Sequence, residues 1–177
     1  QKQYLDAPDF MGQRNHWLSQ FASVVSVLDF PTAFPRPAIK TFAGQAILRK
    51  LDLEEQASIK AFCQAHRCIL FMFLLATLKV LLYKYTRQTD LVIGSPIAGR
   101  SHIDLQNQIG CYANTLALGS QLQEKNTLTH FLQQIKALTL EAYQHQDYPF
   151  DELVEEIPRK RDPSRNPLFD VMLTLQN

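Results

Sequence analysis

The chain has 177 residues, near the usual size of one domain and long enough to bury a substantial core. It carries 18 Lys and Arg against 17 Asp and Glu residues, and 46% of its residues are hydrophobic. These values are typical of a soluble globular protein. They argue against a nucleic-acid partner, because a phosphate-binding surface needs a concentrated basic face.

The cysteines and the apolar stretches bear on compartment. Cys63, Cys68 and Cys111 have no metal-ligand spacing and no clustered histidines, so we expect them to be reduced and partly buried, with no metal site. The first residues contain no apolar signal-peptide core. The most apolar stretch, 69–82, is interrupted by Lys79 and is too short to cross a bilayer. The sequence therefore predicts a cytoplasmic protein without a membrane partner.

The N-terminal part is expected to combine a helix, a proline-rich segment and a strand. Apolar residues recur at roughly helical spacing over 10–22, which predicts a helix. Three prolines within seven residues favour an extended path over 28–38, a segment we call the strap. The sequence leaves open whether the strap lies within one domain or links two. Residues 44–51 then favour a strand.

The middle of the chain alternates helices with strands. Asp52, with a glutamate three residues later, is a typical N-cap for a helix that runs to about His66. A helix over 70–85 follows, and its hydrophobicity on nearly all sides predicts burial. Strands are expected at 91–94 and 113–118, with a loop at 95–100 between them.

The C-terminal part continues this alternation. Thr127 is a typical N-cap for a helix that runs to about residue 146. Asp147 and Pro149 are expected to start a short helix through residue 157. A charged loop and a final strand follow, at 159–166 and 168–175. The whole pattern predicts an α/β fold built on a layered sheet.

Catalytic templates are of little help here. The sequence has no phosphate-binding glycine loop and no nucleophile elbow. Its five histidines are scattered singly, and each is expected on a helix surface or in a loop. These patterns alone therefore do not disclose a function.

Three short segments carry a family resemblance. Residues 109–116 read IGCYANTL, residues 145–151 read HQDYPFD, and residues 161–168 read RDPSRNPL. In order and in approximate spacing they are similar to the motifs IGxFVNT, HQDxPFE and RDxSRNPL of nonribosomal peptide synthetase condensation domains. The segment GSPIAGR at 94–100 and the strap also resemble that family, so the resemblance covers almost the whole chain. The family's catalytic motif, HHxxxDG, is absent from these residues.

The resemblance implies a chloramphenicol-acetyltransferase-like layered sandwich. A condensation domain contains two such subdomains facing each other in a V, with HHxxxDG in the N-terminal one and the reaction in a tunnel between them. Residues 1–177 would be the C-terminal subdomain and would supply one wall of that tunnel. There, the amine of an acceptor aminoacyl thioester attacks a donor acyl or peptidyl thioester to form an amide. We expect no catalytic residue in this chain and no activity from it alone.

The resemblance also implies partners: the N-terminal subdomain, donor and acceptor peptidyl carrier proteins, and a neighbouring adenylation domain. No cofactor would bind directly, because the substrates arrive on the phosphopantetheine arms of the carrier proteins. Two alternatives stay open. The chain would otherwise be a noncatalytic module that docks a carrier protein or a partner half, or a fragment of a related epimerisation or heterocyclisation domain.

Three residues are candidates for the tunnel wall. The amide of Asn114 both donates and accepts hydrogen bonds, which suits a wall that meets thioester and amide groups. Its ordinary alternative is a polar residue that stabilises a strand end. Tyr112 and Ser95 are expected to line the same channel.

Five further residues are structural or interface candidates. Arg100 is expected to pair with the aspartate of HHxxxDG across the two subdomains, or else to be a solvated loop arginine. Asp147 is expected to cap the short helix that follows it. Arg161, Arg165 and Asn166 would organise the charged loop beside the final strand, or else lie on a solvated surface.

Overall fold

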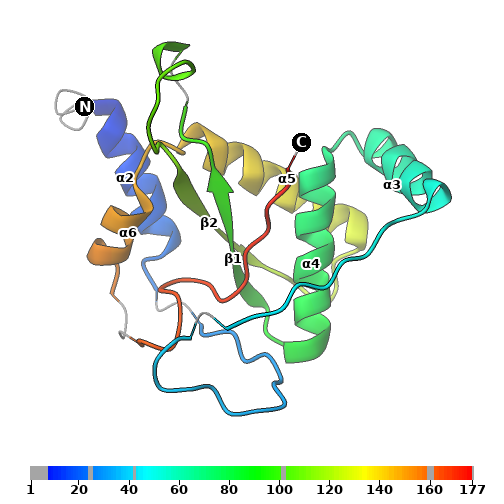
Figure 1. Ribbon diagram of the computed structural model, residues 1–177. Helices are drawn as coiled ribbons and strands as arrows, with labels where there is room; N and C mark the ends of the chain where they lie inside the picture. The colour runs from blue at the N-terminus through cyan, green and yellow to red at the C-terminus, as the bar shows by residue number, and fades with distance from the viewer. Residues whose placement is uncertain (1–7, 24–25, 42, 101–102, 159–161, 177) are drawn as a thin grey trace.

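The computed structural model describes residues 8–23, 26–41, 43–100, 103–158 and 162–176. Their elements are, in chain order, α2 (Pro8–Gln20), α3 (Leu53–Ala65), α4 (Leu70–Thr86), β1 (Asp90–Ile97), the short 3₁₀ helix η1 (Ile103–Leu105), β2 (Asn114–Gln121), α5 (Leu128–Gln144) and α6 (Phe150–Glu156). The β1–β2 hairpin lies in the middle, with α4 and α5 on one side and α2 and α6 on the other (Figure 1). Helix α3 packs outside this arrangement, against α4.

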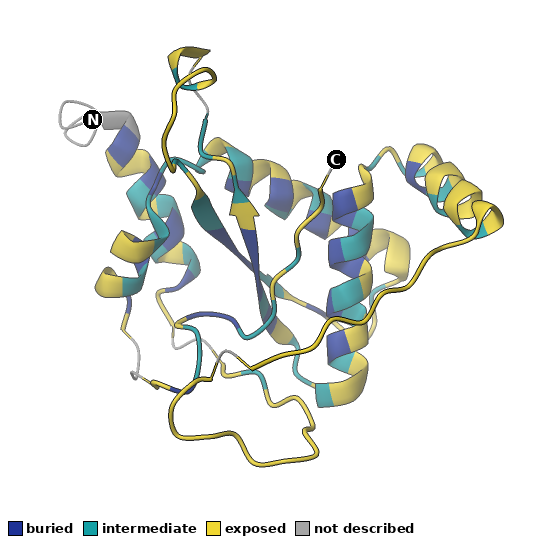
Figure 2. Ribbon diagram, in the orientation of Figure 1, coloured by how far each residue is buried: buried dark blue, intermediate teal, exposed yellow. Residues whose placement is uncertain are grey.

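The hairpin is antiparallel, and its register runs from Asp90 opposite Gln121 to Ile97 opposite Asn114. Strand β1 is therefore longer than the expected 91–94, and the loop expected at 95–100 begins only after Ile97. Leu91, Ile93 and Leu118 are each 3% exposed or less, so the hairpin forms the centre of the core. Figure 2 shows burial concentrated on the hairpin and on the sides of α4 and α5 that face it.

The prediction of a final strand at 168–175 is wrong. This segment forms only an isolated parallel bridge, between Met172 and Gly94 of β1. The Gly94 N–H donates to the carbonyl of Val171 at 3.0 Å, and Leu173 N–H donates to the Gly94 carbonyl at 2.9 Å. The next residue of β1 that would donate at this edge is Pro96, which has no N–H. The ladder therefore stops after one bridge.

The strand expected at 44–51 is also wrong. Residues 43–51 form no strand in the described part of the chain, and the side chains of Ile47 and Leu48 are each 95% exposed. Apolar composition favours a strand only where a neighbouring strand pairs with it and one face is covered. Neither condition is met here. The strap is likewise exposed and has no regular secondary structure (Figure 2).

Two of the predicted helix starts, at Asp52 and at Thr127, are confirmed. Asp52 accepts a hydrogen bond from the Glu55 N–H, and the Glu55 carboxylate accepts one from the Asp52 N–H, which completes a capping box at α3. Thr127 caps α5 by accepting from the His130 N–H. These caps use side chains within three residues of each other, so a local pattern is enough to find them.

A lysine lies at the centre of the core. Lys79, on the hairpin side of α4, is fully buried, and its ammonium donates to the carbonyls of Leu91 at 2.6 Å and Leu118 at 2.8 Å. These carbonyls belong to β1 and β2, so Lys79 ties α4 to both strands. Burial lowers the pKa of Lys79 to about 7.

Among the described residues, no single helix is long and apolar enough to cross a membrane. Only α3 and α4 taken together reach the length and hydropathy of a span, and they meet at a bend of 101°.

Candidate functional site

An open hollow of about 1180 Å³ lies at the end of the hairpin where β1 leaves the sheet and β2 enters it. Its walls come from the connection between β1 and β2 and from the segment between α5 and α6. Two of the three motif segments, 109–116 and 145–151, therefore meet at one place. Tyr112, Asn114 and Asp147 all contribute to the lining.

Asn114, the first residue of β2, joins these two segments. Its amide nitrogen donates to the carbonyls of Gln146 at 2.9 Å and Tyr148 at 2.8 Å. Its amide oxygen accepts from the N–H groups of Phe150 at 3.0 Å and Thr115 at 2.8 Å. Both amide protons and both lone pairs are used, so this arrangement leaves Asn114 no hydrogen-bonding capacity for a ligand.

The cap of α6 comes from Asn114 and not from Asp147. The N-cap residue of α6 is Pro149, which makes no side-chain capping bond, and the first helical N–H, of Phe150, is satisfied by the Asn114 oxygen. The expected Asp147 cap is therefore wrong, because that residue lies two positions before the N-cap. Its backbone N–H instead donates to the Gln13 side chain of α2 at 3.0 Å.

Helix α2 holds the same segment from the other side. The Trp17 indole N–H donates to the carbonyl of His145 at 2.7 Å, and Arg14 forms a charged pair with Glu156 of α6. The hydrogen bond from Arg14 lowers the pKa of Glu156. The segment between α5 and α6 is thus held between β2 and α2.

Arg100 organises the connection between the two strands. Its guanidinium donates to the carbonyls of Leu105, of Gln108 at 2.8 Å and of Gly110 at 3.0 Å, and lies 4.6 Å from the centre of the Tyr112 ring. The Arg100 side chain is thus bound to its own loop. The expected pairing with an aspartate of another subdomain stays a prediction.

Only glycine fits at position 99, just before that arginine. Its φ is +61°, and a β-carbon there would lie 1.8 Å from the carbonyl oxygen of Tyr112. Only glycine allows the two ends of the connection to approach this closely.

Ser95 lies apart from this hollow. It is 5% exposed, sits in β1 opposite Leu116, and is not among the lining residues. The extension of β1 past Gly94 explains this position, because it places Ser95 in the sheet and not in a loop. The structure thus brings Tyr112 and Asn114 together at the hollow and leaves Ser95 in the core.

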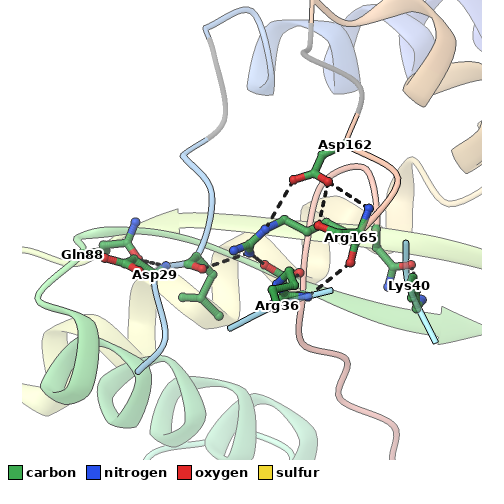
Figure 3. A network of polar contacts seen from close by, with 10 residues as sticks. Asp29, Arg36, Lys40, Gln88, Asp162 and Arg165 are labelled. Carbon is green, nitrogen blue, oxygen red and sulfur yellow. Dashed lines mark hydrogen bonds and ion pairs between the residues drawn. The ribbon is translucent and has the colours of Figure 1, made fainter. Parts of the chain in front are cut away.

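A second cluster joins the strap to the C-terminal charged loop (Figure 3). Arg165 donates to the Leu28 carbonyl at 3.1 Å and to the Asp170 carboxylate, and it lies 3.7 Å from Asp162. The Ser164 hydroxyl and N–H both donate to Asp162, and these bonds lower the pKa of Asp162. Arg165 therefore ties the start of the strap to the loop.

Arg36 of the strap and Lys40, two residues beyond it, reach the same loop. Arg36 donates to the Ser164 carbonyl at 3.3 Å and lies 3.7 Å from the Asp170 carboxylate. Lys40 donates to the Asn166 side chain at 2.8 Å. The strap therefore packs against residues 164–170 of the same fold. Arg161 lies outside the described residues.

The structure brings together two histidines that no sequence pattern had indicated as a pair. The rings of His16 and His145 stack at 3.9 Å between centroids, and His16 lies 3.3 Å from the Glu141 carboxylate. Burial, and then the neighbouring His145, lower the pKa of His16. Only the spacing of Glu141 and His145 on one helix face is a local signal, because His16 comes from a distant part of the chain. No three described His, Cys, Asp or Glu side chains are grouped to hold a metal ion.

Comparison with known proteins decides the family. The family model named Condensation domain matches residues 1–177. The chain belongs to the condensation-domain family. This condensation-domain chain is 43% identical to tyrocidine synthase 3 of Brevibacillus parabrevis over 177 residues, all of this chain and 3% of that protein. It is 41% identical to surfactin synthase subunit 2 of Bacillus subtilis (strain 168) over 169 residues, 96% of this chain and 5% of that protein.

Solved structures agree with the expected condensation-domain fold. Holo-AB3403, a four-domain nonribosomal peptide synthetase bound to AMP and glycine, matches with a TM-score of 0.92 at 27% identity, over 99% of this chain and 13% of that one. The X-domain from teicoplanin biosynthesis matches with a TM-score of 0.84 at 25% identity, over 97% of this chain and 38% of that one. The condensation-domain chain thus spans only a small part of the proteins it matches. The expected chloramphenicol-acetyltransferase-like fold is confirmed.

Proposed function

We propose that residues 1–177 act as the C-terminal subdomain of a peptide-bond-forming condensation domain and form one wall of its tunnel. The observation that carries this proposal is the hollow at the end of the hairpin, together with the family match over the whole chain. Two family motif segments line that hollow although they are separated in sequence by α5. In the tunnel, the amine of an acceptor aminoacyl thioester attacks a donor thioester to form an amide.

The residues of this wall position the reactants. Holding two tethered substrates in the reactive geometry supplies much of the acceleration in such a step. The amine must also lose a proton as the amide forms, and among the described lining residues there is no histidine to take it. The HHxxxDG motif of an N-terminal subdomain would supply that group. Asn114 contributes by fixing the two lining segments to each other.

The partners follow from this role. Donor and acceptor carrier proteins would present the substrates on phosphopantetheine arms, and an adenylation domain would load the acceptor carrier. The N-terminal subdomain would close the tunnel from the opposite side. A cytoplasmic location fits these partners, because aminoacyl adenylation consumes ATP.

Reconstitution tests this proposal. The 177-residue chain is mixed with two loaded carrier proteins, with and without a separately expressed N-terminal subdomain that carries HHxxxDG. We expect amide product only in the complete mixture, and none when the second histidine of that motif is replaced by alanine. Product from the chain alone would show that these 177 residues are catalytically complete. No product from two halves that co-elute as a complex would contradict the tunnel-wall role.

A noncatalytic docking module, the alternative that the sequence leaves open, is a second candidate. It predicts that a carrier protein titrated into the chain shifts a localised set of NMR signals while the complete mixture makes no amide. Carrier binding together with amide formation favours the tunnel wall.

A further inference from the structure

The carboxyl end of α3 brings two cysteines together. The chain leaves the helix through Arg67, whose φ of 50° is left-handed. Arg67 N–H donates to the Gln64 carbonyl at 3.1 Å, and Cys68 N–H donates to the Cys63 carbonyl at 3.0 Å. These two bonds define a Schellman motif, a common way for a helix to end. The first and last residues of the motif, here 63 and 68, commonly pack their side chains on each other. In this chain both positions are cysteine.

The backbone hydrogen bond between Cys68 and Cys63 places the two residues close together in space. Burial, and then the neighbouring Cys68 thiol, raise the pKa of Cys63. Cys63 is buried, whereas Cys68 is half-exposed. With ordinary bond lengths, the 3.0 Å backbone hydrogen bond keeps the two Cα atoms within about 7 Å, the limit for bridging by a disulfide. The separation of the two Cα atoms is therefore within the range that a disulfide can bridge.

We propose that Cys63 and Cys68 form a reversible oxidation site, at which a low-molecular-weight disulfide such as oxidised glutathione closes an intramolecular disulfide. The Cys68 thiolate, the more accessible of the two, attacks one sulfur of the oxidant and releases one thiol. The Cys63 thiol then loses its proton and attacks the Cys68 sulfur, which releases the second thiol. Two protein thiols are oxidised to one disulfide, and the oxidant is reduced to two thiols.

The surroundings favour closure of the ring over a stable mixed disulfide. The Lys136 ammonium of α5 donates to the Arg67 carbonyl at 2.7 Å, so the turn between the cysteines is also held from outside. Fixing the turn raises the effective concentration of one thiol at the other. Cys111 is exposed and remote in sequence from this pair, so it provides an internal control for the oxidant.

Peptide mapping of the native 177-residue chain tests the proposal. After treatment with oxidised glutathione and acid quenching, we expect a Cys63–Cys68 disulfide and a glutathione adduct on Cys111. Free thiols or separate adducts at Cys63 and Cys68, under conditions that fully modify Cys111, would overturn it. In Cys63→Ser, Cys68 should retain its glutathione adduct, whereas Cys111→Ser should form the disulfide as the wild type does.

A second measurement tests whether the folded turn promotes the disulfide, or whether closeness of the two cysteines in sequence is enough. The equilibrium constant for disulfide formation against glutathione is measured with and without denaturant. We expect it to fall about tenfold when the chain unfolds, because the effective concentration of the thiols falls. Equal constants in both states would show that the turn contributes nothing and would overturn the proposal. Neither measurement depends on amide formation, so failure here leaves the proposed function unaffected.

Discussion

At the scale of single residues, Asn114 connects sequence motif to site geometry. The family resemblance suggests a residue that meets substrate, whereas the structure uses all four of its hydrogen-bonding positions on backbone groups of β2, of the segment before α6 and of the first residue of α6. An amide is suited to this place because two partners are acceptors and two are donors. Aspartate has the same shape and no donor. The residue therefore positions the wall of the hollow.

Replacing Asn114 with aspartate tests that role. The carboxylate would face the carbonyls of Gln146 and Tyr148, and we expect a loss of about 2 kcal/mol or more in the free energy of unfolding, measured in urea. Asn166→Ala, which removes an exposed bond to Lys40, is the control and should change stability by less than about 0.5 kcal/mol. If Asn114→Asp unfolds like the wild type but loses amide formation in the reconstituted mixture, the residue contacts substrate instead.

Lys79 predicts a pH dependence of stability. Its pKa falls from 10.5 in the unfolded chain to about 7 in the fold, so the unfolded state binds more protons between these values. The free energy of unfolding should therefore rise as pH increases from about 7 to 10, by on the order of 4 kcal/mol. Lys79→Met should remove this rise, because methionine fills similar volume without a charge.

The matched control for Lys79 is on the same helix. Lys84 is exposed on α4, and Lys84→Met should keep the wild-type dependence of stability on pH. Urea unfolding at a series of pH values measures both variants. A wild-type chain whose stability is flat across this range would show that the Lys79 ammonium stays charged in the core.

At the scale of elements, local signals predict helices better than strands. The caps at Asp52 and Thr127 lie within one turn of the helices they start, so the sequence alone places both helices. A strand needs a partner that is distant in sequence. Residues 44–51 have strand-like composition and no pairing, and 168–175 has a partner whose Pro96 ends the ladder. Neither outcome can be read from the segment itself.

The candidate site shows the same division. The motifs place 109–116 and 145–151 in one site by resemblance, but the bonds that join them are tertiary. Asp147 has the local pattern of a cap, yet Asn114 reaches the helix from β2 and satisfies its first N–H. The stacked His16 and His145 come from α2 and the end of α5, so no window of sequence contains both.

The docking of α2 is predicted to weaken in acid. Burial and the facing His145 hold the pKa of His16 below 6.5, and the Glu141 carboxylate opposes this only in part. The neutral form is thus favoured in the fold, and stability declines as pH falls below about 6.5, because the unfolded state then binds more protons. Trp17, the only tryptophan, donates to the His145 carbonyl, so its fluorescence reports on this contact.

Fluorescence titration of two variants checks this prediction. We expect the Trp17 emission of the wild type to change between about pH 7 and 5, and the change to be reduced in His16→Gln, which cannot be protonated. His130→Gln, at an exposed position of α5, should titrate like the wild type. An identical titration in His16→Gln would assign the change to another group.

At the scale of the whole molecule, the three motif segments serve two places. Two of them line the hollow, and the described part of the third, with Arg165 at its centre, ties the strap to the end of the chain. Arg165 and Arg36 hold the strap against the C-terminal charged loop, and Lys40, just beyond the strap, adds a further contact, while the place of the strap within this subdomain stays a prediction. Two of the family motifs thus shape the hollow, and the third holds the strap against the C-terminal loop.

The exposed apolar side chains predict self-association. Ile47 and Leu48 are each 95% exposed and Leu53 is 83% exposed, on a stretch that packs little against the rest of the fold. Exposed apolar groups of this kind favour association with another surface. We expect light scattering to show a mean mass that rises with concentration, and a smaller rise in the double variant Ile47→Lys and Leu48→Gln.

The control Thr41→Lys adds the same charge to the same exposed segment without removing an apolar group. If both variants suppress association equally, charge repulsion is the cause. A wild-type chain that stays monomeric at every concentration would show that this apolar stretch does not drive self-association.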